Sequence, residues 1–359
     1  MSARRRVRGG LRRGGAVFLG IGALSLASGG VAIAQSASAL AQGSSAPAPS
    51  THLILVTGLG GAPEYSDLFL AQGRSLLEAA RGRWGLPEAN TVWLAEAPER
   101  APGLINGRST RKALEAEVLA AAGRAGPNDG VLIVLIGHGS GSGGDSKINL
   151  PGPDVSGADL AVWLNAFTTQ TVAVVNTASA SGGFVSALSG DRRIVVTATR
   201  STRERERTYF GSYFVDAFIA DGADTDKDQR VSLLEAFQYA RREVGRRYER
   251  DNQLLTEHAM LDDNGDGEGT AEPGATVGDG PLAGGFFLAS AGRTVTRAAA
   301  DDPELARLLI EKGRLEGRIA ALRMMKDTMD PAKYDAQLET LVLELATTNR
   351  SIRDKGSGS

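Results

Sequence analysis

Two short polar motifs each follow an apolar run that is typical of a buried β-strand. His138 comes just after residues 131–136 (VLIVLI), and Ser179 comes soon after residues 172–175. The carboxyl ends of neighbouring parallel strands meet at one edge of a sheet, so both side chains are expected to face one cleft. In that position a histidine can act as the base for a serine nucleophile. The alternative is that both motifs are glycine-rich turns with incidental polar residues.

Neither motif matches two common glycine-rich signatures. Thr177 and Ser181 stand where the nucleophile elbow of α/β-hydrolases requires glycine. Residues 139–144 (GSGSGG) lack the spacing of a dinucleotide-binding loop and contain no lysine for a phosphate loop. The sequence therefore gives no support to either of these chemistries.

A second chemical signal is the acidic segment 224–235 (DTDKDQRVSLLE), which has carboxylates at positions 1, 3, 5 and 12 of a calcium-binding loop. Oxygen ligands at this spacing suit Ca²⁺, so calcium is the predicted cofactor. Gln229 replaces the usual glycine at position 6, where the backbone is strained. The alternative is an acidic turn that caps the following helix. The candidate ligands are Asp224, Asp226, Asp228, the backbone carbonyl of Arg230, Ser232 and Glu235.

A shorter acidic segment, 262–267 (DDNGDG), places Asp262, Asn264 and Asp266 at positions 1, 3 and 5 of the same pattern. Pro273 falls where the pattern needs its final glutamate. This segment is therefore predicted to be a turn, or to donate ligands to the loop 224–235.

The elements between these motifs alternate between strand and helix. Helical spacing is found in residues 64–83 and 109–125 and after the capping residue Ser156. Such alternation predicts an α/β fold with a mostly parallel sheet covered by helices. The predicted strands are 52–57, 91–94, 131–136, 172–175 and 194–197, with a helix at 213–220 before the acidic loop and another at 233–248 after it.

The segments Gly137-His138-Gly139 and 178–182 (ASASG), in this order, resemble the motifs of caspase-like peptidases. Within that group the chain is most similar to the legumain-like C13 peptidases and their bacterial relatives, over residues 52–290. The resemblance implies a caspase-like fold and a peptide or protein ligand. It places His138 at the catalytic histidine position and Ser179 at the nucleophile position, with the N–H groups of Gly139 and Ser179 forming the oxyanion hole.

The family nucleophile is cysteine, whereas this chain has Ser179 at that position and no cysteine anywhere. A thiol ionises near pH 8.5, but a serine hydroxyl must lose its proton to a closely bonded, well-oriented base. No acidic residue that would orient His138 is evident. We therefore predict a pseudo-peptidase that acts as a binding or scaffold protein. The alternative is an active endopeptidase that uses a Ser179–His138 dyad.

In the resembled family the segment 200–207 (RSTRERER) borders the substrate cleft, so Arg200 and Glu204 are candidate substrate-binding residues. The alternative is a solvated loop of mixed charge.

The C-terminal part carries two heptad seams on either side of Pro331, which predicts a helical hairpin or coiled coil over residues 301–353. The hairpin is expected to pack on itself, on the core or on a protein partner. The seams consist of Leu305, Leu308, Lys312, Leu315, Ile319 and Leu322, and of Tyr334, Leu338, Leu341, Leu345, Thr348 and Ile352.

The N-terminus reads as an export signal, because six arginines before residue 14 precede the uncharged run 16–34. The prediction is a signal peptide over 1–41 and a flexible tether over 42–50, followed by the caspase-like domain over 51–292. The protein would then be periplasmic or extracellular. The alternative is that residues 16–34 remain uncleaved and anchor the chain in the membrane.

Composition limits the remaining function classes. Hydrophobic residues make up 42% of the chain and charged residues 23%, as in ordinary globular proteins. Without the six N-terminal arginines, 34 basic residues remain against 42 acidic ones, so the mature chain is acidic. An acidic surface disfavours nucleic acid as a partner. After cleavage no membrane-spanning segment is expected.

The export prediction can be tested directly on secreted or periplasmic material. N-terminal sequencing should find a mature chain that begins near Gln35 or Gln42, after the small-residue sites at 32–34 and 39–41. Recovery of Met1 or Ser2 from membrane-bound protein would instead support an uncleaved anchor.

Overall fold

The computed structural model describes residues 50–288, ten positions between 304 and 322, and residues 329–356. The predicted signal peptide and nearly all of the predicted tether lie outside these residues. Within the described residues, no helix is both long enough and apolar enough to cross a lipid bilayer.

The centre of the fold is a sheet in which a set of parallel strands ends in one antiparallel edge strand. Its spatial order is β10-β9-β8-β4-β1-β2-β3. Only the pairing of β10 with β9 is antiparallel. The strands are β1 (Thr51–Thr57), β2 (Thr91–Ala95), β3 (Gly107–Arg108), β4 (Gly130–Ile136), β8 (Thr171–Asn176), β9 (Arg193–Thr197) and β10 (Met260–Asp262).

The register aligns the carboxyl ends of the central strands. Thr57 of β1 pairs with Ile136 of β4, and Leu135 pairs with Asn176 of β8. The chain runs from β1 outward to β2 and β3, and from β4 outward in the opposite direction. The strand order therefore reverses between β1 and β4, which is where ligands bind in open α/β sheets.

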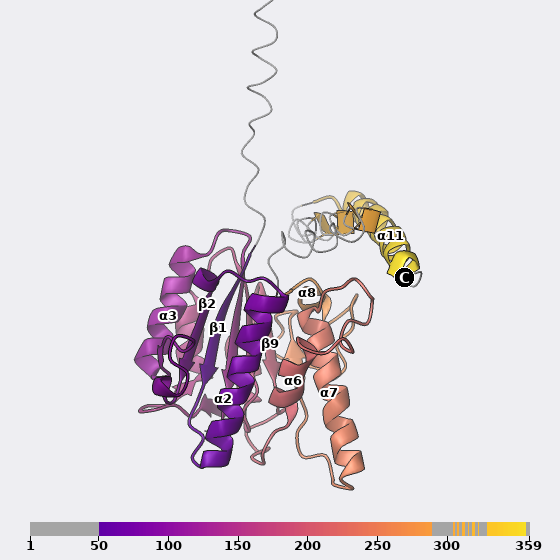
Figure 1. The fold of residues 1–359 in the computed structure, drawn as a ribbon. Coiled ribbons are helices and arrows are strands. Elements are labelled where there is room, and N and C mark those ends of the chain that lie inside the picture. The colour runs from indigo at the N-terminus through magenta and orange to yellow at the C-terminus, as the bar shows by residue number, and fades with distance from the viewer. Residues whose placement is uncertain are drawn as a thin grey trace, which may run out of the picture. The chain divides into compact units, whose positions relative to one another are not determined.

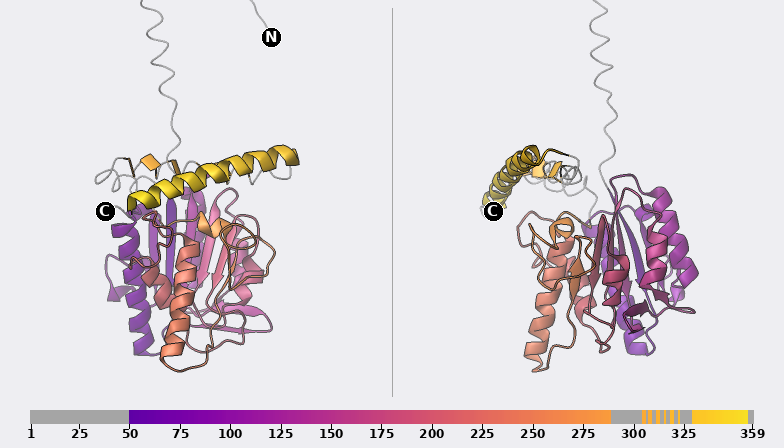
Figure 2. Two further views of the ribbon diagram at one scale, coloured as in Figure 1. Left: turned by 90° about the vertical axis from the view of Figure 1, so that its right-hand side faces the viewer. Right: turned by 180° about the vertical axis from the view of Figure 1, so that it is seen from behind.

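Helices cover both faces of the sheet (Figures 1 and 2). Because successive residues of a strand point to opposite faces, Leu53 and Leu55 of β1 pack with α2, α6 and α7, while Ile54 and Val56 pack with α3, α4 and α5. The helices are α2 (Pro63–Glu78) continuing into the π-helical η1 (Ala79–Arg83), α3 (Arg111–Arg124), α4 (Gly157–Leu164), α5 (Gly183–Leu188), α6 (Phe210–Ala217), α7 (Leu233–Arg250) and α8 (Pro281–Gly284), with the 3₁₀ turns η2 (Glu88–Asn90) and η3 (Pro98–Arg100).

These observations confirm the predicted fold class, a mostly parallel sheet covered by helices. The glycine-rich segment after His138 is not the simple turn of the alternative interpretation. It forms β5 (Gly139–Ser142), which pairs with β6 (Asp145–Ile148) and through it with β7 (Val155–Ser156) in a small antiparallel sheet. Gly143 and Gly144 have positive φ values of 60° and 96°, which allows the tight hairpin turn between β5 and β6.

The helix predicted at residues 213–220 is wrong in its bounds, since α6 spans Phe210–Ala217. Its N-cap residue, Tyr209, has no side-chain cap of its own. Instead, the distant Glu257 carboxylate accepts hydrogen bonds from the N–H groups of Tyr209 (2.7 Å) and Phe210 (3.0 Å). The start of the helix is therefore set by a tertiary contact that local sequence does not reveal.

In the C-terminal part, helix α11 spans Pro331–Gly356. It begins at the predicted proline and ends at Gly356, three residues beyond the predicted hairpin. Leu305 clusters with Ile352 near the end of α11. Leu315, Ile319 and Leu322 cluster with Tyr334 and Leu341 nearer its start. This pairing is what two antiparallel helices would produce.

The Glu257 cap makes stability depend on pH. Burial raises the pKa of Glu257 from 4.5 to about 7. The folded protein therefore retains a proton that the unfolded chain releases between about pH 4.5 and 7, so the stability contributed by Glu257 falls as the pH rises through this window. Glu257→Gln lacks this titration. As the pH rises from 4.5 to 7.5, its free energy of unfolding should therefore increase relative to that of the native protein, by up to about 3 kcal/mol. Urea unfolding at both pH values measures this difference, and parallel pH dependence of the two proteins would contradict it.

Candidate active site

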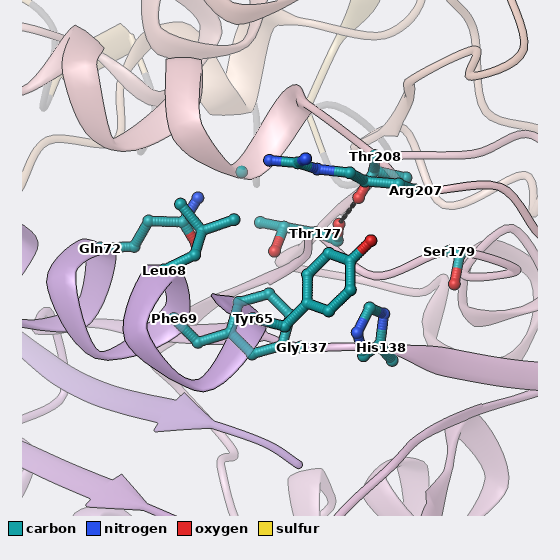
Figure 3. Close-up of a pocket in the computed structure, with 11 residues that line it drawn as sticks. Tyr65, Leu68, Phe69, Gln72, Gly137, His138, Thr177, Ser179, Arg207 and Thr208 are labelled. Atoms are coloured by element: carbon teal, nitrogen blue, oxygen red, sulfur yellow. Dashed lines mark hydrogen bonds between the residues drawn. The ribbon is translucent and has the colours of Figure 1, made fainter. Parts of the chain in front are cut away.

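His138 and Ser179 line one pocket at the carboxyl edge of the sheet, as the sequence predicted (Figure 3). His138 follows β4 and Ser179 follows β8, which is the adjacent parallel strand. Ser179 is 6% exposed. The opposite wall of the pocket comes from α2 and from the loop that precedes α6. The lining residues are Tyr65, Leu68, Phe69, Gln72, Gly137, His138, Thr177, Ser179, Arg207, Thr208 and Gly211.

The His138 ring packs against two aromatic side chains. Tyr65 and Phe69 of α2 contact it edge-on, with ring centroids 4.6 and 5.2 Å away. The backbone of Gly60, in the loop after β1, also acts on the ring and favours its protonated form. The two rings of α2 therefore limit how the imidazole can turn.

The electrostatic surroundings keep His138 neutral. Burial lowers the pKa of His138 below its ordinary value, and the nearby Arg207 guanidinium lowers it further. The backbone of Gly60 acts in the opposite direction but does not outweigh them. A neutral imidazole has a free lone pair on the nitrogen that does not carry the proton. His138 can therefore accept a proton at neutral pH.

The Ser179 hydroxyl is bonded to the residue after the histidine and not to the histidine itself. Its Oγ accepts a hydrogen bond from the Gly139 N–H at 3.4 Å and donates one to the Gly139 carbonyl at 3.3 Å. Among the hydrogen bonds of the described residues, none joins Ser179 Oγ to His138. The next residue, Ala180, has a φ of 53°, a left-handed conformation that is uncommon for a residue other than glycine.

Two glycines allow the loops of the site to approach each other closely. A Cβ atom on Gly139 would lie 2.2 Å from the Ser179 carbonyl oxygen, and one on Gly182 would lie 2.3 Å from the backbone of Arg200. Any larger residue would force these backbones apart. Glycine at position 139 therefore keeps its N–H within reach of Ser179.

Arg207 and Gln72 are pocket residues that sequence analysis missed. The Arg207 guanidinium lies 5.6 Å from the centroid of Tyr65 and 5.0 Å from that of Tyr209. Gln72 donates to Ser212 Oγ at 2.8 Å, while its buried Oε1 has no partner. The mixed-charge segment 200–207 indicated a basic residue at the border of the cleft, but the sequence did not distinguish Arg207 from the other arginines of that segment. For Gln72 no sequence signal was present.

Arg200 and Glu204, the predicted substrate-binding residues, are not part of the pocket lining. Glu204 accepts hydrogen bonds from the Arg200 N–H at 3.1 Å and from the His258 N–H at 3.0 Å, and its other oxygen contacts His258 Nδ1 at 2.7 Å. Its carbonyl accepts from the Ala180 N–H at 2.7 Å. These bonds brace the loop after Ser179, while a direct role in substrate binding stays a prediction.

Residues 105–262 match the model described as the Peptidase C13 family, and this range includes His138 and Ser179. The matched part is a little under half of the chain, and over it the chain is similar to the peptidase C13 family. The resemblance inferred from the two motifs is therefore confirmed, and the sheet has the mostly parallel α/β architecture that it implied.

Two solved structures are similar to this chain. Protein GSU0716 from Geobacter sulfurreducens is 12% identical, with a TM-score of 0.41, and the match covers 67% of this chain and 100% of that one. The Drosophila initiator caspase Dronc is 11% identical, with a TM-score of 0.39, and covers 67% of this chain and 84% of that one. No curated protein sequence matches the chain.

The segment 224–235, which does not line the His138–Ser179 pocket, has the local geometry of a calcium loop. Carboxylate oxygens of Asp224, Asp226 and Glu235 lie within 4.8 Å of one another. Gln229 has a φ of 65°, which is the left-handed conformation that glycine usually adopts at position 6. Its N–H donates to Asp224 Oδ2 at 3.0 Å. Burial and the neighbouring carboxylates, Asp228 foremost, raise the pKa of Asp224 to about 6.

The end of this segment is also the start of α7. The Ser232 hydroxyl accepts from the Glu235 N–H at 3.2 Å, and Glu235 Oε2 accepts from the Ser232 N–H at 2.9 Å, which is a capping box. Glu235 Oε1 accepts from the Thr225 N–H at 2.9 Å. Glu235 therefore ties the beginning of the loop to the helix that follows it.

The second acidic segment does not join this cluster of oxygens. Asn264 donates to Asp266 Oδ2 at 2.9 Å, so these two side chains bond to each other. Asp263, which was not among the predicted ligands, accepts from the N–H groups of Gly280 and Ala283 at 2.7 Å and so fixes α8. Asp262 is 1% exposed and burial raises its pKa. A metal-binding role for Asp262, Asn264 and Asp266 stays a prediction.

The pocket electrostatics can be tested by NMR titration of His138. Arg207→Gln removes a positive charge that lowers the pKa of His138, so the pKa should rise toward its ordinary value. Arg203→Gln, an exposed change in the same loop, should leave it unmoved. The His138 signal is assigned by its loss in His138→Gln. An unchanged pKa in Arg207→Gln would contradict the proposed contact.

Proposed function

We propose that this C13-family domain binds peptide segments in the His138–Ser179 pocket and, with serine at position 179, does not cleave them efficiently. The observation that carries the proposal is the pairing of Ser179 Oγ with the Gly139 backbone in place of the His138 imidazole. A serine nucleophile depends on a base that is hydrogen-bonded to it, because the hydroxyl is hardly ionised at neutral pH. Here the hydroxyl is bonded to the Gly139 backbone instead.

The site retains the parts that a cysteine would use. A thiolate forms without a tight bond to the histidine, since its pKa is far lower than that of a hydroxyl. His138 is half-buried, packed against Tyr65 and Phe69, and neutral. The Gly139 nitrogen lies 3.4 Å from Oγ of residue 179, so its N–H is a candidate oxyanion donor beside the nucleophile position. These features support descent from an active C13-type site.

The pocket also offers groups that recognise a peptide side chain. Arg207 presents five donors to an oxygen-bearing side chain, and the unpartnered Gln72 Oε1 can accept from an N–H group. Tyr65 and Phe69 supply apolar walls. We therefore expect the ligand to be a peptide or protein segment that inserts a polar side chain.

Two further parts of the proposal rest on the sequence and on α11. The arginine-rich N-terminus followed by residues 16–34 supports export. Val342 and Leu343 of α11 are 45% and 61% exposed, although their neighbours form the internal seam. This exposure supports a role for the C-terminal hairpin in binding a protein partner.

The central experiment restores the family's nucleophile. Ser179→Cys should cleave a peptide library at least about tenfold faster than the native protein, equivalent to about 1.4 kcal/mol of transition-state stabilisation. Ser140→Cys, which places a thiol on the exposed side of β5, should gain nothing. His138→Ala in the Ser179→Cys background should abolish the gain. The measurement is the initial rate of cleavage of fluorogenic peptides.

Peptide binding is measured in parallel, because a cleft can bind without supporting cleavage. The native protein should bind a subset of the library by fluorescence anisotropy, and Arg207→Gln should weaken that binding. Cleavage by the native protein that Ser179→Ala abolishes would overturn the proposal and establish a serine endopeptidase. If neither the native protein nor Ser179→Cys binds or cleaves any peptide, the proposal that this pocket binds peptide segments is wrong.

A further inference from the structure

A lysine from the C-terminal part of the chain is bound in the calcium-type loop. Lys312 Nζ lies 3.0 Å from Asp226 Oδ2 and is also bonded to Asp228 Oδ2. Its side chain is only 3% exposed, and that of Asp228 is 2% exposed. The ammonium group belongs to a segment 84 residues further along the chain. A cation supplied by the protein itself thus occupies the acidic cluster.

Lys312 is also an anomaly in its own segment. It stands in a heptad seam whose neighbouring positions, Leu308 and Leu315, are apolar. Leu315 is buried against α11 in the described structure. A lysine at such a position weakens the packing of a helical seam, and it fixes a particular arrangement when it has a charged partner. Asp226 and Asp228 are the partners that this position requires.

The oxygens that hold Lys312 are those that a calcium ion would need. Asp226 and Asp228 are positions 3 and 5 of the loop, and a calcium ion is held by positions 1, 3, 5 and 12 together. The loop already has the required backbone, with Gln229 in the left-handed conformation and Asp224 held by the Gln229 N–H. Metal and ammonium would therefore compete for the same two carboxylates.

The loop carries more negative than positive charge, so a divalent ion can replace the ammonium group. Within the loop and its contacts, the carboxylates of Asp224, Asp226, Asp228 and Glu235 face two bound cations, Lys312 and Arg230. Arg230 contacts Asp228 Oδ2 at 2.9 Å and stacks on Phe287, with its Cζ 3.9 Å from the ring centroid. Arg230 is thus part of the loop that it neutralises, whereas Lys312 comes from a distant segment and can leave with that segment.

We propose that the loop 224–235 is a cation site for which Lys312 and a calcium-type divalent ion compete, so that binding of the ion releases the C-terminal segment that carries Lys312. The two cations exclude each other because they share oxygens and repel at close range. Coupling between two ligands of one site is reciprocal. Calcium therefore weakens docking of Lys312 to the same degree that docked Lys312 weakens calcium binding. This inference is independent of any peptidase activity.

The test is a calorimetric Ca²⁺ titration of the full chain. Lys312→Gln should bind Ca²⁺ at least about tenfold more tightly than the native protein, a change of about 1.4 kcal/mol. The matched control Lys333→Gln removes the same charge from an exposed position of α11 and should change the affinity less than twofold. Asp226→Asn should abolish binding in both backgrounds. Circular dichroism confirms that each variant is folded.

A second measurement needs no variant. Hydrogen exchange of the native protein should show faster exchange around Lys312 when Ca²⁺ is added, and slower exchange in the loop 224–235. Three results would overturn the proposal: no Ca²⁺ binding by native or Lys312→Gln protein at millimolar Ca²⁺, equal affinities of these two proteins, or an equal gain in Lys333→Gln. Calcium binding with unchanged exchange around Lys312 would overturn it as well.

Discussion

The parallel pairing of β4 with β8 is the constraint on which the candidate site depends. The two strands are in register from Gly130–Thr171 to Leu135–Asn176, and their side chains are almost wholly buried between two helix layers. A shift by one residue would turn every side chain of the strand to the opposite face, so the register is firmly held. It fixes His138 and Ser179 at the same edge, although 40 residues lie between them. The close contact of Gly139 with the Ser179 carbonyl then sets the spacing of the two loops.

The site separates orientation of the histidine from activation of the nucleophile. His138 is packed against the rings of Tyr65 and Phe69, neither of which requires residue 179 to take part. That arrangement suits a thiol, which ionises without a tightly bonded base. It suits a hydroxyl poorly, and Ser179 Oγ is found with the Gly139 backbone instead. An arrangement in which a cysteine can ionise without a hydrogen bond to the histidine therefore does little to deprotonate a serine hydroxyl.

Much of the fold was predictable because the signals for it are local. Apolar runs such as 131–136 and the capping residue Ser156 define elements by themselves, and the order of elements then places His138 beside Ser179. The antiparallel edge strand β10 and the small sheet of β5, β6 and β7 were missed, because short strands have little periodicity. The start of α6 was missed because its cap, Glu257, comes from elsewhere in the chain.

The parts of the site that could not be predicted are those made by contacts between distant segments. The rings that pack on His138 come from α2, and nothing in the sequence pairs Tyr65 or Phe69 with the histidine. Arg207 is one of several arginines in its loop, and only the folded chain shows that it stacks on Tyr65. Lys312 was visible as the single charged residue in an apolar seam, but its partners are known only from the structure.

Helix α7 joins the acidic loop to the wall of the pocket. Glu235 in its first turn belongs to the loop, and Arg247, roughly 18 Å further along the helix axis, lies 4.4 Å over the ring of Tyr209. Arg207 covers the same ring and then that of Tyr65, which touches His138. The first turn of α7 therefore belongs to the charge cluster, and its C-terminal part packs on a stack of alternating aromatic rings and guanidinium groups. A tilt of the helix at its first turn would shift Arg247 against Tyr209, and the shift would reach His138 through Arg207 and Tyr65.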